Sequence, residues 1–95
     1  MDLKGIRDQI DAIDDELIIL FKKRMELSAQ VAEYKRKNNL PIYVPAREQE
    51  ILRTISEKVG PELSDYACSL YSVIFELSRN YQSKCDRISS DTEVV

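Results

Sequence analysis

Residues 6–39 read IRDQIDAIDDELIILFKKRMELSAQVAEYKRKNN, a long stretch with neither glycine nor proline. Its apolar side chains recur at alternating steps of three and four, apart from one position in the series that Arg24 occupies, and this spacing is typical of one helix face. The apolar series comprises Ile6, Ile10, Ile13, Leu17, Leu20, Leu27 and Val31. The pattern predicts one continuous helix of roughly 50 Å.

Such a helix is too long for the rest of a 95-residue chain to cover. A compact domain of that size is only about 30–35 Å across. We therefore expect the helix to pack against a second copy of the chain. Because Arg24 lies on the packed face, it requires a buried anion to compensate its charge.

Composition excludes several classes of function. The net charge is −3 and the basic residues are scattered, so we expect no nucleic-acid partner. Histidine is absent and there are only two cysteines, so we expect no metal and no cofactor. The longest apolar run, residues 17–21, is too short to cross a membrane, and the charged N-terminus does not resemble a signal peptide. These features predict a cytoplasmic protein.

The remaining chain reads as two further helices in a single all-α domain, residues 1–95. Asp2 is a suitable N-cap for the first helix, which we expect over about 3–38. Pro45 suits the first turn of a short second helix, about 45–58, and Gly60 and Pro61 follow its end. A third helix of medium length is expected over about 64–85, followed by a polar tail, 86–95.

Two cations share one face of the long helix. Lys35 follows Arg24 by eleven residues, which is three turns, so their backbones are roughly 16 Å apart on the same side. Extended toward each other, they leave a gap that suits a small dianion. The alternative is that Arg24 pairs with a glutamate of a partner helix while Lys35 extends into solvent.

Arg7 is about 25 Å from Arg24 along the same helix and cannot grip the same small ligand. In an antiparallel pair of helices it could complete the partner's site, or it could simply be solvated. In the short helix, Glu48 suits the helix dipole whereas Arg47 opposes it.

The third helix carries an apolar stripe bordered by polar residues. Ser78 and Gln82 are one turn apart on that border, where neutral groups can hydrogen-bond a ligand. An ordinary polar flank is the alternative. The apolar stripe comprises Ala67, Leu70, Ile74, Leu77 and Tyr81.

Taken together, these residues resemble the all-helical class of chorismate mutases over nearly the whole chain. The ordered motifs are Ile6-Arg7-x-x-Ile10-Asp11-x-Ile13-Asp14-x-x-Leu17, Arg24-x-Glu26-Leu27, Val31-Ala32-x-x-Lys35, Pro41-Ile42-x-x-x-x-Arg47-Glu48 and Ser78-x-x-x-Gln82. The set is specific because the fragments occur in the family's order and spacing.

The resemblance implies an intertwined antiparallel homodimer, with long helices spanning both subunits, that rearranges chorismate to prephenate for phenylalanine and tyrosine synthesis. It also implies residue roles. Arg24 and the other subunit's Arg7 hold the two carboxylates of the substrate, and Ser78 assists them. Lys35 and Gln82 face the ether oxygen of the breaking bond. Glu48 accepts a hydrogen bond from the ring hydroxyl, and Arg47 borders the site.

Val44 departs from the family pattern, in which aspartate is frequent at this position. The family uses the backbone amide here, so Val44 remains a substrate-binding candidate, but the capping of the second helix is in question. Two other functions stay open: an isochorismate-pyruvate lyase on the same fold, and a non-catalytic helical dimerisation module.

Overall fold

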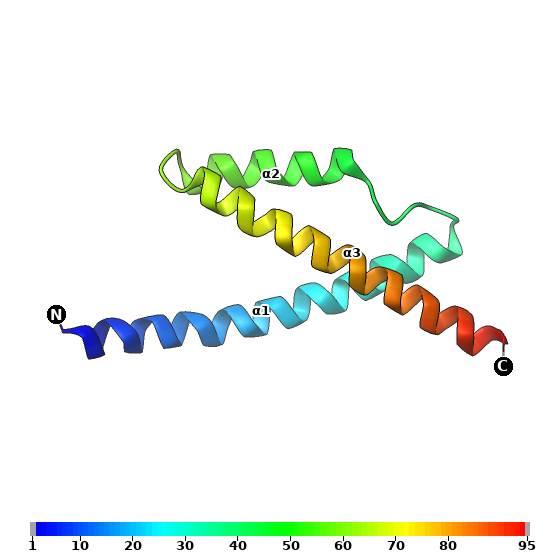
Figure 1. The fold of residues 1–95 in the computed structure, drawn as a ribbon, viewed down its shortest axis with the longest axis horizontal. Coiled ribbons are helices and arrows are strands. Elements are labelled where there is room, and N and C mark those ends of the chain that lie inside the picture. The colour runs from blue at the N-terminus through cyan, green and yellow to red at the C-terminus, as the bar shows by residue number, and fades with distance from the viewer. Residues whose placement is uncertain (1, 95) are drawn as a thin grey trace.

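The structure, a computed structural model, describes the backbone of residues 2–94 and the side chains of residues 2–85. Over residues 2–94 the backbone forms three helices: α1 (Leu3–Lys37), α2 (Pro45–Val59) and α3 (Ser64–Val94). Figure 1 shows α3 starting beside the end of α2, running back along α2 and then crossing the C-terminal half of α1. The predicted all-α fold class is confirmed.

Local signals explain where α1 begins and ends. The Asp2 carboxylate accepts a hydrogen bond from the Gly5 amide at 2.7 Å, which caps the first turn as expected. At the other end, the Asn38 amide still donates to the Tyr34 carbonyl at 3.1 Å. Asn39 then adopts a left-handed φ of 55°, which asparagine tolerates better than most residues, and the helix stops.

The second helix begins at Pro45 and ends before Gly60, whose φ of 84° favours glycine. Its N-cap is Val44, and the Val44 side chain offers no hydrogen bond to the first turn. Only the Val44 carbonyl helps, accepting from the amides of Arg47 at 3.1 Å and Glu48 at 3.3 Å. The valine therefore leaves the N-terminus of α2 without a side-chain cap.

Replacing this valine by aspartate should stabilise the chain. In Val44→Asp the new carboxylate can accept from an amide of the first turn, which typically contributes about 1 kcal/mol. Urea unfolding followed by circular dichroism measures the change. Val44→Ala is the matched control, because it removes the valine without adding an acceptor. Equal unfolding free energies for the aspartate and alanine variants would contradict this account of the cap.

The third helix is longer than predicted. The sequence suggested an end near residue 85 and a polar tail over 86–95, whereas the helical backbone continues to Val94. The reason is that no glycine or proline follows Pro61, so nothing in the chain interrupts the backbone hydrogen bonds. Polarity alone was a poor indicator of the end of this helix.

The chain does not wrap around a core of its own. Its radius of gyration is 17.1 Å and its extents are 59 × 28 × 14 Å, whereas a compact chain of this length has a radius of gyration of about 12 Å. Among the described side chains, Ala32 and Phe75 are the only buried apolar ones. The apolar series of α1 from Ile6 to Val31 remains 40–59% exposed. A single chain thus leaves its longest apolar face uncovered.

The face of α3 that packs inward is the one carrying polar groups. Phe75, Ser78 and Gln82 are buried, at 5%, 6% and 8% exposure, whereas Leu70 and Leu77 on the apolar stripe are 57% and 44% exposed. Burying hydroxyl and amide groups costs free energy unless they find partners. This choice of face points to a site built around those polar groups.

Candidate active site

A cavity of about 380 Å³ lies between the C-terminal half of α1, the start of α2 and the middle of α3. This volume is within the range of small-molecule sites. Seven of the eight site residues predicted from sequence line it: Arg24, Lys35, Val44, Arg47, Glu48, Ser78 and Gln82. The fold therefore brings together residues that are up to 58 positions apart in the chain (82 − 24).

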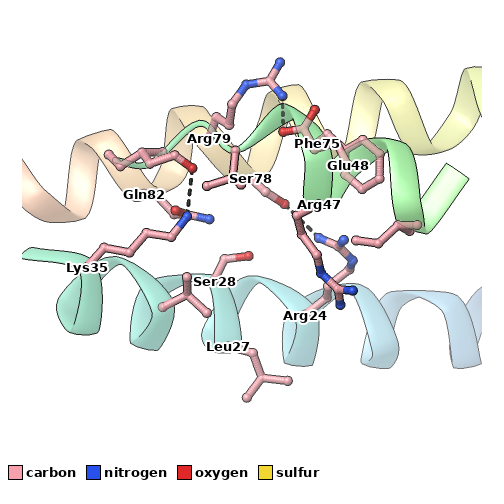
Figure 2. A pocket seen from close by; sticks show the side chains of 14 residues that line it. Arg24, Leu27, Ser28, Lys35, Arg47, Glu48, Phe75, Ser78, Arg79 and Gln82 are labelled. Carbon is pink, nitrogen blue, oxygen red and sulfur yellow. Dashed lines mark hydrogen bonds and ion pairs between the residues drawn. The ribbon is translucent and has the colours of Figure 1, made fainter. Parts of the chain in front are cut away.

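Arg24 points into this cavity. Its Nη1 donates a hydrogen bond to Ser78 Oγ at 2.8 Å, and its Cζ lies 5.9 Å from the centroid of the Phe75 ring (Figure 2). The side chain is half-buried. The contact with Ser78 joins α1 to α3 and fixes the guanidinium without neutralising its charge.

Lys35 lines the opposite end of the same α1 face. Its Nζ donates to the backbone carbonyl of Ile42 at 2.8 Å, which ties the connector between α1 and α2 to the helix. An ammonium group has three donors, so this bond leaves capacity for a ligand. Like Arg24, Lys35 is bonded to a neutral acceptor, and its positive charge is not compensated by this contact.

Gln82 carries a buried polar atom that lacks a hydrogen-bond partner in the described part of the chain. This atom is the side-chain amide oxygen, Oε1. An unsatisfied buried amide oxygen typically costs about 1–3 kcal/mol. A polar ligand in the cavity, or reorientation of the amide around one, would remove this cost.

Glu48 and Arg47 occupy the α2 side of the cavity. Glu48 forms an ion pair with Arg79 of α3, with side-chain exposures of 22% and 31%. Arg47 is exposed and pairs with Glu50 on its own helix at 2.9 Å. Of the two charged residues singled out on α2, Glu48 is the one held in contact with another element.

Sequence reasoning missed Arg79 and Ser28. Arg79 lines the cavity and its Cζ stacks 4.7 Å from the centroid of the Tyr43 ring. Its contact with Glu48 spans 31 positions, so no local spacing could have indicated it. Ser28 is 7% exposed and rises from α1 into the cavity (Figure 2). Its place one turn after Arg24 on the same face was a usable signal.

The charge of the cavity lining selects for anions. Four cationic side chains line it, and Glu48 is the one acidic residue among the lining residues described. They belong to a chain whose overall charge is −3, so the concentration of positive charge is local. The cationic residues are Arg24, Lys35, Arg47 and Arg79. This arrangement suits a ligand with two negative charges.

Arg7 is the predicted site residue that a single chain does not bring to the cavity. It is exposed near the start of α1 and does not line the pocket. Its separation from Arg24, about 25 Å along one helix, prevents a shared small ligand within the subunit. Its predicted role depends on a second copy of the chain.

Within residues 2–85, whose side chains the structure describes, no three histidine, cysteine or acidic side chains gather in a way that could hold a metal ion. Over residues 2–94, none of the helices combines the length and apolarity needed to span a bilayer.

Comparison with known proteins identifies the family. Residues 6–83 match the family Chorismate mutase type II. The match covers most of the chain, and the protein belongs to this family. The resemblance inferred from the sequence motifs is thereby confirmed.

Individual relatives agree with this assignment. The chain is 49% identical over 61 residues to the T-protein of Haemophilus influenzae, covering 61% of this chain and 16% of the relative. It is 46% identical over 54 residues to the bifunctional chorismate mutase/prephenate dehydratase of Aquifex aeolicus, covering 57% and 15%. It is 29% identical over 69 residues to the intracellular chorismate mutase of Mycobacterium tuberculosis, covering 73% and 65%.

The alignments with the T-protein and the Aquifex relative thus span about one-sixth of those proteins. No solved structure matches the chain.

Proposed function

We propose that this protein is a chorismate mutase, which converts chorismate to prephenate on the route to phenylalanine and tyrosine. The observation that carries the proposal is that two cationic side chains, Arg24 and Lys35, line the same cavity. Both cations are half-buried, and the structure gives each a neutral hydrogen-bond acceptor. A small dicarboxylate would supply the missing negative charge.

The residues suit the chemistry of this rearrangement. One C–O bond breaks while one C–C bond forms within a single molecule, with no nucleophile and no obligatory proton transfer. The protein must hold the flexible enolpyruvyl arm over the ring, which lowers the barrier through orientation. It must also stabilise negative charge that grows on the ether oxygen as the C–O bond breaks.

We assign these tasks to the cavity residues. Arg24, assisted by Ser78, binds one carboxylate. The Lys35 ammonium and the Gln82 amide donate to the ether oxygen, and they lie on facing helices, α1 and α3, as this requires. Glu48 accepts a hydrogen bond from the ring hydroxyl.

Two residues at the α2 end of the cavity complete the assignment. Val44 contributes through its backbone amide, so its side chain is secondary for binding. Arg47 borders the substrate.

A homodimer completes the site. The exposed apolar face of α1 is the surface that a second α1 would cover, since the apolar series from Ile6 to Val31 is exposed along it. In an antiparallel pair, the N-terminal half of one helix lies beside the C-terminal half of the other. Arg7 of the partner subunit then reaches the cavity and holds the second carboxylate.

A cytoplasmic location agrees with the cysteines. Cys68 and Cys85 are both free thiols and both half-buried. Free thiols are typical of a reducing compartment.

Purified protein that is given chorismate should produce prephenate, and the absorbance of prephenate measures its formation. Offered isochorismate, it should not release salicylate and pyruvate. If it released both efficiently and left chorismate unchanged, its activity would be that of an isochorismate-pyruvate lyase on the same fold.

A bicyclic dicarboxylate that mimics the transition state should raise the melting temperature by several degrees, because saturating ligand at 100 times its Kd stabilises by about 2.7 kcal/mol. Absence of both turnover and a thermal shift would instead indicate a dimerisation module.

A further inference from the structure

Arg79 connects three separate parts of the chain at the cavity. Its Nη1 donates to Glu48 Oε2 on α2, while its guanidinium lies over the Tyr43 ring of the connector. Arg79 itself is on α3. One side chain therefore links the helix that carries Ser78 and Gln82 to the two segments that close the cavity from the other side.

The geometry at Glu48 leaves part of its carboxylate available. The described bond to Arg79 uses Oε2, and no described hydrogen bond uses Oε1. A carboxylate has capacity for several hydrogen bonds. Glu48 can accordingly stay paired with Arg79 and still accept from a ligand hydroxyl.

The ion pair between Glu48 and Arg79 matters because other cationic side chains line the same cavity. Glu48 shares its cavity with Arg24, Lys35 and Arg47, and each of these attracts an unpaired carboxylate. In a partly buried site such attraction is strong, since solvent screens it less than at a surface. An unrestrained Glu48 would compete with the ligand's carboxylates for these groups.

We propose that Arg79 is a positioning residue that reserves Glu48 for a ligand hydroxyl and keeps it from neutralising the cations that bind the ligand's carboxylates. This inference rests on the proposed function. The hydrogen bond with Glu48 raises the pKa of Arg79 above its ordinary value, against the opposing effect of burial. The Tyr43 ring adds a cation–π contact that holds it in place.

The test compares Arg79→Met with Arg53→Met. Arg53 is exposed on α2 outside the cavity, so its replacement removes the same charge from an open surface. We expect Arg79→Met to raise KM and weaken binding of the bicyclic dicarboxylate on the order of tenfold or more, with a smaller change in kcat. Arg53→Met should behave like the unaltered protein. Equal affinities in the two variants would overturn the proposal.

A double variant separates positioning from a merely structural role. In Arg79→Met/Glu48→Gln the competing charge is gone, while glutamine still offers a carbonyl acceptor to the hydroxyl. We expect this variant to bind the dicarboxylate more tightly than Arg79→Met alone. Additive losses would overturn the proposal, because Arg79 would then act independently of Glu48.

Arg79→Lys provides a rescue that does not depend on the methionine variant folding normally. Lysine keeps a positive charge beside Glu48, so it should recover most of the affinity lost in Arg79→Met. A lysine variant as weak as the methionine variant would refute the proposed charge pairing. If the unaltered protein neither formed prephenate nor bound the dicarboxylate, the proposed function itself would fail; an active protein insensitive to Arg79→Met would refute only the role of Arg79.

Discussion

Lys35→Ala should reduce kcat by about 10²–10³-fold, the usual effect of removing one preorganised donor from developing negative charge. The ammonium is held toward the cavity by its bond to the Ile42 carbonyl, so it needs little reorganisation during the reaction. It stabilises the transition state more than the bound substrate, because charge on the ether oxygen grows as the bond breaks. Initial rates of prephenate formation over a range of chorismate concentrations measure this effect.

Lys37→Ala is the control for this variant. Lys37 is two residues further along α1, and it pairs with Glu33 at 3.1 Å on an exposed surface. Its loss should leave kcat unchanged, since exposed ion pairs contribute little. If purified, folded Lys35→Ala protein kept near-normal turnover, the electrostatic mechanism proposed here would be wrong.

Co-expressing Arg7→Ala with Arg24→Ala should restore activity that each variant lacks alone. Each substitution is expected to lower kcat/KM on the order of 10²-fold, because removing one partner of a buried charge pair typically costs about 2–5 kcal/mol, much of it from the carboxylate left unpaired. In a mixed dimer, one site combines the intact Arg24 of one subunit with the intact Arg7 of the other. Random pairing gives about one-quarter of the normal number of complete sites.

Active-site titration with the bicyclic dicarboxylate, alongside prephenate formation, measures the recovery. The control is co-expression of Arg24→Ala with Lys35→Ala, whose two lesions fall in the body of each subunit's own site and leave no complete site in any pairing. Recovery in this control, or none in the first pair, would show that Arg7 does not act across the subunit interface.

Helix positions were accessible from the sequence because they depend on local signals. The period of the apolar residues, the cap at Asp2, and the breaks at Asn38, Pro45 and Gly60 predicted the start of every helix and the ends of α1 and α2 closely. The end of α3 was misplaced by nine residues (94 − 85). Polar composition indicates solvent exposure, whereas helix termination requires a residue that disrupts the backbone pattern.

The grouping of site residues was partly accessible. Arg24 and Lys35 could be paired from helix geometry alone, since both lie on α1. Arg79 could not be found this way, because its significance depends on Glu48 of α2 and Tyr43 of the connector. Which stripe of α3 turns inward was also undecided, as both its apolar and its polar-bearing stripes have helical spacing.

The chain's own residues thus prescribe three helices, an apolar face too long for one subunit to bury, and two cations on that helix's inner side. Such properties follow from interactions between residues that are close together in the chain, so they can be predicted from the sequence alone. The packing of α3 against α1 and α2 decided which charged groups lie in contact. Glu48 forms an ion pair with Arg79, whereas Arg24 and Lys35 donate to neutral acceptors. Electrostatic energy depends on distance and on exclusion of water, and both are set when the helices come together.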